Sequence, residues 1–184
     1  MRLLVIRHGE SEADLLHVRE GRADFELTER GHRQAEAMGG YVSQNYQIDK
    51  LYCSTLKRAA QTLDEHLMEF NNGLLAGLEH GVAEKKYPRV ETPLHLAVYE
   101  QESALDFRYR AEYMLSKLIS ENDEDSTIAA VTHGGMINQL YRAFFRLPVD
   151  SEFGFKTGDT GIHEWIIDKG SRIVVKANHI PHNL

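Results

Sequence analysis

Two segments of the sequence end an apolar run in a histidine that is followed by glycine. Residues 3–11 are LLVIRHGES, and residues 129–137 are AAVTHGGMI. A neutral histidine can attack phosphorus through one ring nitrogen when the other donates its proton to a fixed acceptor, because that hydrogen bond selects the tautomer. Arginine supplies paired N–H donors that match phosphate oxygens. The neighbouring Arg7 and His8 therefore indicate phosphoryl-transfer chemistry, in which cations stabilise the charge on the transferring group.

A third segment, CSTLKRA at residues 53–59, places a serine and an arginine in a similar position. Apolar runs predict buried strands of a parallel sheet at Leu3–Ile6, Leu51–Cys53 and Ile128–Thr132. The carboxyl ends of parallel strands share one edge, where such sheets bind ligands. Glycines there let the backbone approach a ligand, and helix N-termini offer N–H groups to an anion. The sequence thus predicts one cationic pocket, built from Arg7, His8, Gly9, Ser54, Arg58, His133, Gly134 and Gly135.

Helical periodicity predicts helices between these strands. Thr28 can cap a helix with Ala35, Met38, Val42 and Tyr46 on one face. Another helix is expected to begin near Thr55. The residues Ser103 to Asp106 form a capping-box variant with Asp in place of the usual Glu, before a helix with Phe107, Ala111, Met114 and Leu118 on one face. The helix after the last parallel strand carries Ile137, Leu140, Tyr141 and Phe144.

The rest of the chain completes an α/β pattern. Ile162–Asp168, a Lys169-Gly170 turn and Arg172–Ala177 predict a hairpin. Residues 8–27 lack a clear period and are expected to be loop, and residues 86–101 a loop or a lid over a site. Strands separated by helices predict a mostly parallel sheet flanked by helices on both faces, with a C-terminal hairpin. Without repeats or an interdomain linker, residues 1–184 are expected to form a single domain.

Composition excludes several classes of protein. The 184 residues are 42% hydrophobic and 27% charged, which favours a globular domain over disorder. A net charge of -7 without a basic stripe argues against nucleic acid as a partner. The sequence has no signal-peptide pattern and no apolar run long enough to span a membrane. Its single cysteine, Cys53, is expected to be a buried residue that only fills space in the core. These features predict a cytoplasmic protein without a membrane partner. No metal-ligand cluster supports the His179 and His182 pair, so no metal or cofactor is expected.

The ordered motifs resemble those of the histidine phosphatase superfamily, also called the phosphoglycerate mutase-like family. RHGES near the N-terminus, STLKRA and the late THGG carry this resemblance, with further matches at GRADFELTERGHRQA (residues 21–35) and LMEFNNGLLAGL (residues 67–78). The resemblance covers nearly the whole chain, and it implies a fold of the kind predicted above.

The resemblance also implies roles for individual residues. His8 would be the nucleophile that becomes phosphorylated, and Arg7, Arg58 and His133 would bind the phosphoryl group. Glu69 stands in the position of the family's acidic residue and would be the proton donor, although periodicity alone would not single it out. Further substrate-binding positions are Gly9, Ser11, Asp14 and Gly134, together with Arg22 in a loop that borders the site in relatives.

The sequence departs from the family pattern in two places. Position 14, often asparagine in relatives, is Asp14, whose carboxylate either faces the phosphate, faces solvent, or pairs with Arg7 or Arg58. The segment from Thr62 to Leu67 is shorter than in relatives, which finish a long helix there and add a strand before the acid. This shortness reflects either a deletion or residues absent from the sequence.

The function expected from these observations is that of a metal-independent phosphomonoesterase acting through a phosphohistidine. A small phosphorylated metabolite is the expected substrate, with a phosphoprotein as the alternative. A phosphoglycerate mutase is the first competing function, but mutases of this family are usually longer, with extra segments over the site. The second is a catalytically weak module that binds a phosphorylated ligand.

Overall fold

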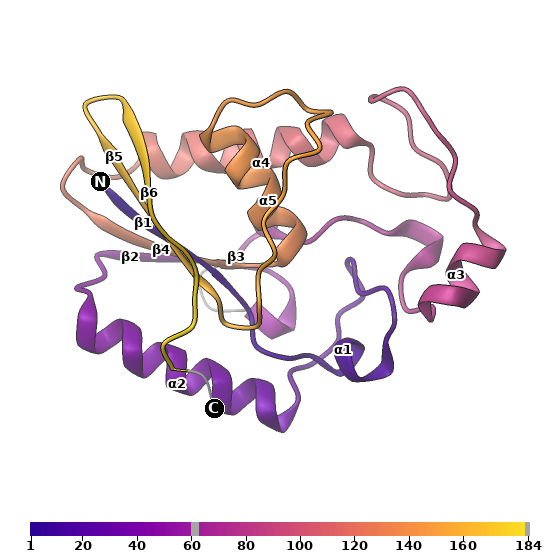
Figure 1. Ribbon diagram of the computed structural model, residues 1–184, viewed down its shortest axis with the longest axis horizontal. Coiled ribbons are helices and arrows are strands. Elements are labelled where there is room, and N and C mark those ends of the chain that lie inside the picture. The colour runs from indigo at the N-terminus through magenta and orange to yellow at the C-terminus, as the bar shows by residue number, and fades with distance from the viewer. Residues whose placement is uncertain (60–62, 183–184) are drawn as a thin grey trace.

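The computed structural model describes residues 1–59 and 63–182 and shows helices on both faces of a central sheet (Figure 1). Its strands are β1 (Arg2–Arg7), β2 (Lys50–Ser54), β3 (Leu63–Asp64), β4 (Thr127–Thr132), β5 (Ile162–Asp168) and β6 (Ser171–His179). Its α-helices are α1 (Glu12–Leu16), α2 (Glu29–Asn45), α3 (His80–Lys86), α4 (Ala104–Ser120) and α5 (Gly134–Phe144). Three short 3-10 helices are η1 (Lys57–Ala59), η2 (Glu65–Leu67) and η3 (Gly73–Leu75).

Six strands of the described chain form one sheet in the order β3-β2-β4-β1-β5-β6. The first four strands are parallel to one another, whereas β5 runs antiparallel to β1 and β6 antiparallel to β5. The predicted α/β fold with a mostly parallel sheet and a C-terminal hairpin is therefore confirmed. Because β1, β2 and β4 are parallel, the residues that follow them emerge at the same edge of the sheet.

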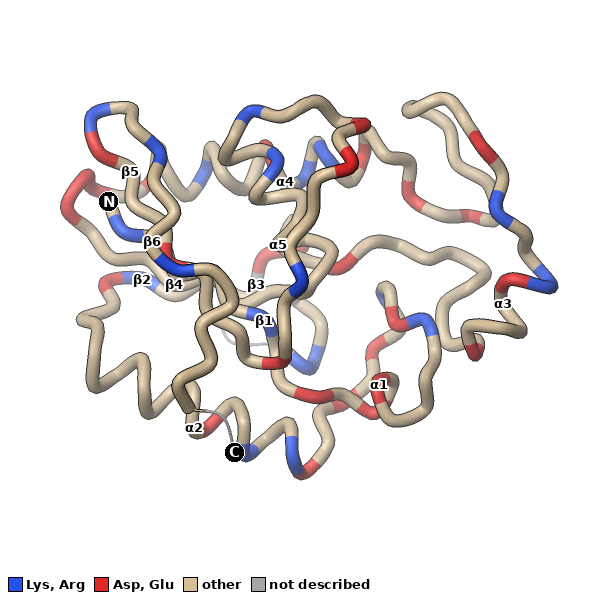
Figure 2. Tube along the Cα trace, viewed as in Figure 1, with Lys and Arg blue, Asp and Glu red and all other residues tan. Residues whose placement is uncertain are grey.

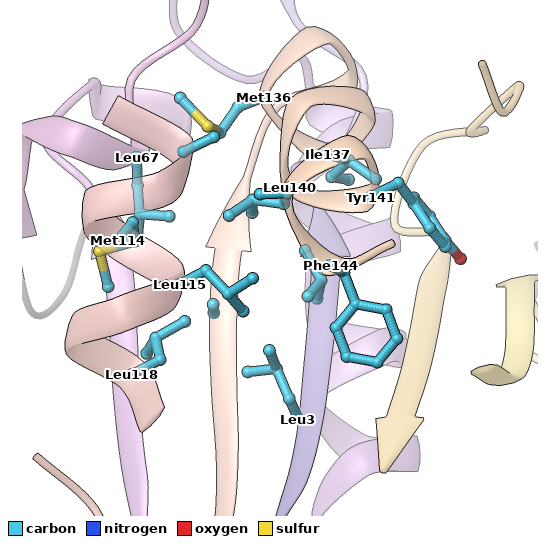
Figure 3. Close-up of a cluster of buried hydrophobic side chains, with 14 of the residues drawn as sticks. Leu3, Leu67, Met114, Leu115, Leu118, Met136, Ile137, Leu140, Tyr141 and Phe144 are labelled. Carbon is cyan, nitrogen blue, oxygen red and sulfur yellow. The ribbon is translucent and has the colours of Figure 1, made fainter. Parts of the chain in front are cut away.

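The side chains of β1 alternate between two apolar layers. Leu3 and Val5 pack with α4 and α5 in the larger cluster, part of which Figure 3 shows. Leu4 and Ile6 face the opposite side and pack with Val42 of α2. A strand buried on both faces needs an unbroken apolar run, which explains the sequence LLVI. The strand is thereby fixed, and so is the residue that follows it.

The hairpin turn has the geometry that its two residues favour. Asp168 pairs directly with Ser171, so Lys169 and Gly170 form the whole turn. Both have positive φ angles, 46° and 83°. Two consecutive positive φ values define the type I′ turn, whose twist matches that of the flanking strands.

The expectation of loop throughout residues 8–27 is wrong, because α1 lies within it. Ser11 caps this helix through its side chain, and the carboxylate of Asp14 accepts a hydrogen bond from the backbone N–H of Ser11. This is the same Ser-x-x-Asp box that the sequence analysis identified at Ser103. The helix has five residues and is too short to show a helical period, so its capping box was the one local signal that could have indicated it.

The helix expected near Thr55 is also not found in the part of the chain that the structure describes; the 3-10 helix η1 stands there instead, and residues 60–62 lie outside the described residues. The short strand β3 follows at Leu63 and pairs with Cys53 and Ser54. Parallel neighbours usually need a crossover of about a dozen residues or more. Here β3 pairs only with the last two residues of β2, so the chain need not return along the whole strand. Thr62 is outside the described residues, but the strand before Glu69 is present as β3.

Residues 86–101, which were expected to be a loop or a lid, contain no strand. Their only helical residue is Lys86, the last residue of α3. From there to the start of α4 at Ala104 the chain forms an extended excursion beside α3, away from the sheet (Figure 1). Among the described residues no helix combines the length and hydropathy needed to cross a membrane.

Candidate active site

His8 follows β1, which pairs with β4 on one side and with β5 on the other. Its backbone N–H donates to the Thr132 carbonyl at 3.0 Å, and its carbonyl accepts from the Thr160 N–H at 3.0 Å. Its side-chain Nδ1 lies 2.7 Å from the carbonyl oxygen of Gly9. A carbonyl oxygen can only accept, so the proton of the neutral ring is on Nδ1 and Nε2 keeps its lone pair. The ring thus has the tautomer that attack on phosphorus requires.

The surroundings of His8 keep the imidazole uncharged. Burial is the largest cause that lowers the pKa of His8, from 6.5 to about 3, and the charges of Arg7 and Arg58 lower it further. Burial and nearby like charge both disfavour the imidazolium form. The ring is therefore neutral at physiological pH.

Arg58 is held by backbone carbonyls. Its side chain is 0% exposed, and its two terminal nitrogens each donate at 3.0 Å, Nη1 to the carbonyl of Ala23 and Nη2 to that of Gly21. Its Nε is buried without a hydrogen-bond partner. The guanidinium is thus anchored and keeps one unsatisfied donor.

Arg7 is arranged in a similar way. Its Nη1 donates to the Thr157 carbonyl at 2.9 Å and lies 3.3 Å from a carboxylate oxygen of Asp159. Its Nη2 lies 3.6 Å from Oδ1 of Asp14, and its Nε is buried without a hydrogen-bond partner. Buried polar groups normally find partners, so unsatisfied donors on two neighbouring cations are a feature that a bound anion would explain.

His133 directly follows β4 and is the N-cap residue of α5. Its ring centroid lies 5.0 Å from that of His8, and its Nε2 lies 2.8 Å from Oγ of Ser54 at the end of β2. Its Nδ1 is buried without a partner. Burial is the largest cause that holds the pKa of His133 well below its usual value, followed by His8, Arg58 and Arg7. The ends of β1, β2 and β4 therefore meet around two neutral histidines, as the sequence predicts.

Glu69 reaches this edge of the sheet from the segment after η2. Its Oε1 accepts from the N–H of Phe70 at 2.7 Å, and its Oε2 accepts from the N–H of Gly135 at 2.9 Å. A Cβ atom on Gly135 would lie 2.2 Å from Oε1 of Glu69, so the Glu69 carboxyl group would have to move if another residue stood here. Gly134 faces the other side of the site, because a Cβ there would lie 4.0 Å from Nε of Arg7.

The segment that carries Glu69 is tied down by Arg110 of α4. Its Nη1 donates to the carbonyls of His66 and Met68, and its Nη2 donates to the carbonyl of Glu69 at 3.1 Å. Glu102 pairs with the same guanidinium at 2.7 Å. No sequence pattern identifies Arg110, because a single charged residue on a helix belongs to no motif. Its contacts explain how a short segment presents Glu69 in a fixed position.

The other predicted binding residues have defined partners. The backbone of Gly9 passes so close to α2 that a Cβ atom there would lie 2.4 Å from the carbonyl oxygen of Gly31. Asp14 both caps α1 and pairs with Arg7, and its side chain is 34% exposed. Arg22 lies 3.5 Å from Glu102. The substrate-binding roles of these three residues stay predictions.

Glu20 lies in the site and was missed by the sequence analysis. Its Oε2 is 3.9 Å from Nε2 of His8, and its Oε1 is 3.4 Å from Nε of Arg58 and accepts a hydrogen bond from the hydroxyl of Ser11. Figure 2 shows acidic positions gathered on the segment around α1 to which it belongs. Desolvation is the main cause that raises the pKa of Glu20. No motif in the sequence points to Glu20, because it lies in residues 8–27, which were expected to be loop.

A cavity of about 270 Å³ opens beside Phe70, the residue after Glu69. Most of its lining comes from residues 90–101, part of the segment predicted as a loop or lid, and its inner wall includes Phe107 and Gln139. Among the described residues no cluster of His, Cys, Asp and Glu has the form of a metal site.

Comparison with known proteins assigns the family. The model of the histidine phosphatase superfamily, branch 1, matches residues 3–180. The chain belongs to this superfamily. Phosphoserine phosphatase 1 of Hydrogenobacter thermophilus is 22% identical over 200 aligned positions, which cover 99% of this chain and 94% of the relative. A 2,3-bisphosphoglycerate-dependent phosphoglycerate mutase of Mesorhizobium japonicum is 28% identical over 164 positions, with 77% and 80% covered.

A solved structure extends the comparison to the fold of histidine phosphatases. The phosphoserine phosphatase of Entamoeba histolytica, in complex with phosphoserine, superposes with a TM-score of 0.78 and is 26% identical. The match covers 100% of this chain and 99% of that chain. The relatives thus include both phosphatases and mutases of the superfamily.

Proposed function

We propose that this histidine phosphatase is a phosphomonoesterase that hydrolyses a small phosphorylated metabolite through a phosphohistidine on His8. The observation that carries the proposal is the neutral His8, whose Nε2 keeps its lone pair beside three buried side-chain nitrogen atoms that make no hydrogen bond. Those atoms are Nε of Arg7, Nε of Arg58 and Nδ1 of His133. Such a site combines a nucleophile with fixed positive charge for the equatorial oxygens of a phosphoryl group.

The reaction has two steps. Nε2 of His8 attacks phosphorus, the bond to the leaving oxygen breaks, and Glu69 transfers a proton to that oxygen. The carboxylate of Glu69 then takes a proton from water as the water attacks the phosphohistidine, which releases inorganic phosphate and restores His8. In each step Arg7, Arg58 and His133 hold the phosphoryl oxygens. We expect the organic part of the substrate to extend past Glu69 toward Phe70, which lines a cavity together with residues 90–101.

A phosphoglycerate mutase is the second candidate, favoured by the similarity to the Mesorhizobium japonicum enzyme. A mutase must keep its phosphoenzyme from water and return the phosphoryl group to a sugar acid. A binding module without turnover is the third. The cytoplasmic location and the preference for a metabolite over a phosphoprotein rest on composition and on the family, and they stay predictions.

Two measurements distinguish these functions, and a third tests the independence from metal. Turnover of 4-nitrophenyl phosphate separates an enzyme from a binding module, and we expect it to be lost in the His8→Ala variant. Incubation with 3-phosphoglycerate should release inorganic phosphate, whereas formation of 2-phosphoglycerate would favour the mutase. Activity is expected to persist in EDTA; a loss that a divalent ion restores would contradict a metal-independent mechanism. A panel of phosphorylated metabolites would then identify the substrate class.

A further inference from the structure

The carboxyl group of Glu20 occupies the space that a substrate phosphoryl group must enter. Its Oε2 lies 3.9 Å from Nε2 of His8, and its Oε1 lies 3.4 Å from Nε of Arg58. For in-line attack, the phosphorus atom must come within about 3–3.5 Å of the same histidine nitrogen. Oxygens of the phosphoryl group would then contact Glu20. An ionised carboxylate in contact with a phosphate dianion is strongly unfavourable, because two like charges cannot share one site.

The hydroxyl of Ser11 contacts two carboxyl groups, those of Asp14 and Glu20. Its oxygen lies 3.0 Å from Oδ2 of Asp14 and also contacts Oε1 of Glu20. The hydroxyl has only one hydrogen, so it can donate to only one of these two carboxyl groups. If both carboxyls are ionised, the second contact joins two acceptors without a hydrogen. A proton on Oε2 of Glu20, the oxygen that lies toward His8, removes one of the two negative charges, while Oε1 still accepts from the Ser11 hydroxyl.

We propose that Glu20 binds the phosphoryl group in its protonated form, donating its O–H to a phosphoryl oxygen, so that anion binding takes up a proton. This inference rests on the proposed function only in placing the phosphoryl group at His8. The proton comes from solvent when the anion binds and returns to solvent when phosphate leaves. Glu20 is then a binding residue whose charge state decides how tightly the site holds an anion.

The groups that face Glu20 agree with this assignment. Desolvation is the largest cause that raises its pKa, and Asp14 raises it as well, whereas Arg58, the Ser11 hydroxyl and Arg7 lower it. His8 faces it from the end of β1 and is neutral. An arriving anion adds a further negative charge, so the pKa of Glu20 rises again on binding. Between the free and bound pKa values, affinity for a dianion must fall by about tenfold per pH unit as the pH rises.

Sulfate is a suitable probe because it is a tetrahedral dianion that does not titrate between pH 5 and pH 9. Calorimetric titration of the full chain with sulfate, in buffers of different ionisation enthalpy, gives the number of protons taken up. We expect this number to approach about one per site in the wild-type protein above the pKa of free Glu20. The Glu20→Gln variant presents an amide N–H at every pH; it should take up no proton and bind sulfate at least about tenfold more tightly at neutral pH.

A matched control is Glu12→Gln, which removes an exposed carboxylate from the same acidic segment. It should leave the proton count unchanged. Proton uptake that persists in Glu20→Gln would assign the proton to another group, such as His8, and would overturn the proposal. Sulfate binding to the wild-type protein without proton uptake, or no sulfate binding at all, would overturn it too.

The number of protons that the wild-type protein takes up with sulfate tests the proposal even if Glu20→Gln does not fold. Failure of the proposed function has a different signature. In that case sulfate would bind with proton uptake, but His8 would never become phosphorylated by a substrate.

Discussion

The hydroxyl oxygen of Ser54, the last residue of β2, lies 2.8 Å from Nε2 of His133, which directly follows the neighbouring strand β4. The N–H of Leu56 donates to the same hydroxyl at 3.4 Å, which leaves the hydroxyl proton free to donate to Nε2. The proton of the neutral His133 ring is then on Nδ1, which is buried without a partner. Ser54 thereby orients His133 as a hydrogen-bond donor for a phosphoryl oxygen.

Replacement of Ser54 by alanine should therefore weaken anion binding. The change leaves Nε2 of His133 buried and unpaired, which costs about 1–3 kcal/mol, and it frees the ring to take the other tautomer. We expect the inhibition constant of inorganic phosphate to rise by roughly tenfold. The exposed neighbour Thr55, changed to alanine, is the control. Equal inhibition of both variants would show that Ser54 does not position His133.

Glu69→Gln should impair poor leaving groups most. An alkoxide must be protonated as it departs, whereas a nitrophenolate leaves without help. A positioned acid typically contributes on the order of 10²–10⁴-fold, so the loss should approach this range with an alkyl phosphate and be much smaller with 4-nitrophenyl phosphate. Single-turnover rates on both substrates test this expectation.

The exposed Glu65→Gln provides a control on the same segment. An equal loss on the two substrates in Glu69→Gln would argue against a proton-donating role. The acid would then have to be another carboxyl, and Glu20 would be examined first.

Asp14→Asn should tighten phosphate inhibition, but only modestly. The substitution removes a negative charge 3.6 Å from Arg7, which still has Asp159 at 3.3 Å to hold it in place. The Asp14 side chain is 34% exposed, and pairs of this kind are typically worth about 0–1 kcal/mol. We expect an inhibition constant lowered by less than about fivefold, with the difference shrinking at high salt. A weaker inhibition by phosphate would mean that Asp14 matters chiefly by holding Arg7 in position.

Glycines of α2 offer a stability test within a single helix. A Cβ atom on Gly31 would lie 2.0 Å from the carbonyl oxygen of Glu10, whereas Cβ atoms on Gly39 and Gly40 would meet nothing within 4 Å. Gly31→Ala should lower the free energy of unfolding by about 1–3 kcal/mol, because the helix must move away from the segment that follows His8. Gly39→Ala should raise it by about 0.5–1 kcal/mol through helix propensity. Urea denaturation measures both, and a harmless Gly31→Ala would refute the close approach.

The fold was largely predictable because its strands and long helices follow simple patterns. The run LLVI was expected to be a buried strand and is one, and Thr28 and Ser103 cap the helices that they were expected to cap. The errors fall where the elements are short. The five-residue α1 has no visible period, and β3 has only two residues, so neither has a hydrophobic pattern of its own.

The site was predictable only in part. Arg7, His8, Arg58 and His133 follow strand ends, and topology alone brings them together. Glu69 was identified by resemblance, since its position depends on contacts with Gly135 and with Arg110 that no local pattern encodes. Glu20 was missed because a carboxylate beside a nucleophile that binds anions contradicts the simplest electrostatic expectation.

The central claim is that His8 becomes phosphorylated, and trapping the phosphoenzyme tests it most directly. The protein would be mixed with an excess of substrate, quenched within milliseconds under alkaline denaturing conditions that preserve phosphoramidates, and digested for mass spectrometry. We predict one phosphoryl group on the peptide that contains His8, stable to base, lost in acid and absent from the His8→Ala variant. Turnover by wild-type protein with no phosphoryl group on His8, or full activity of His8→Ala, would contradict the account.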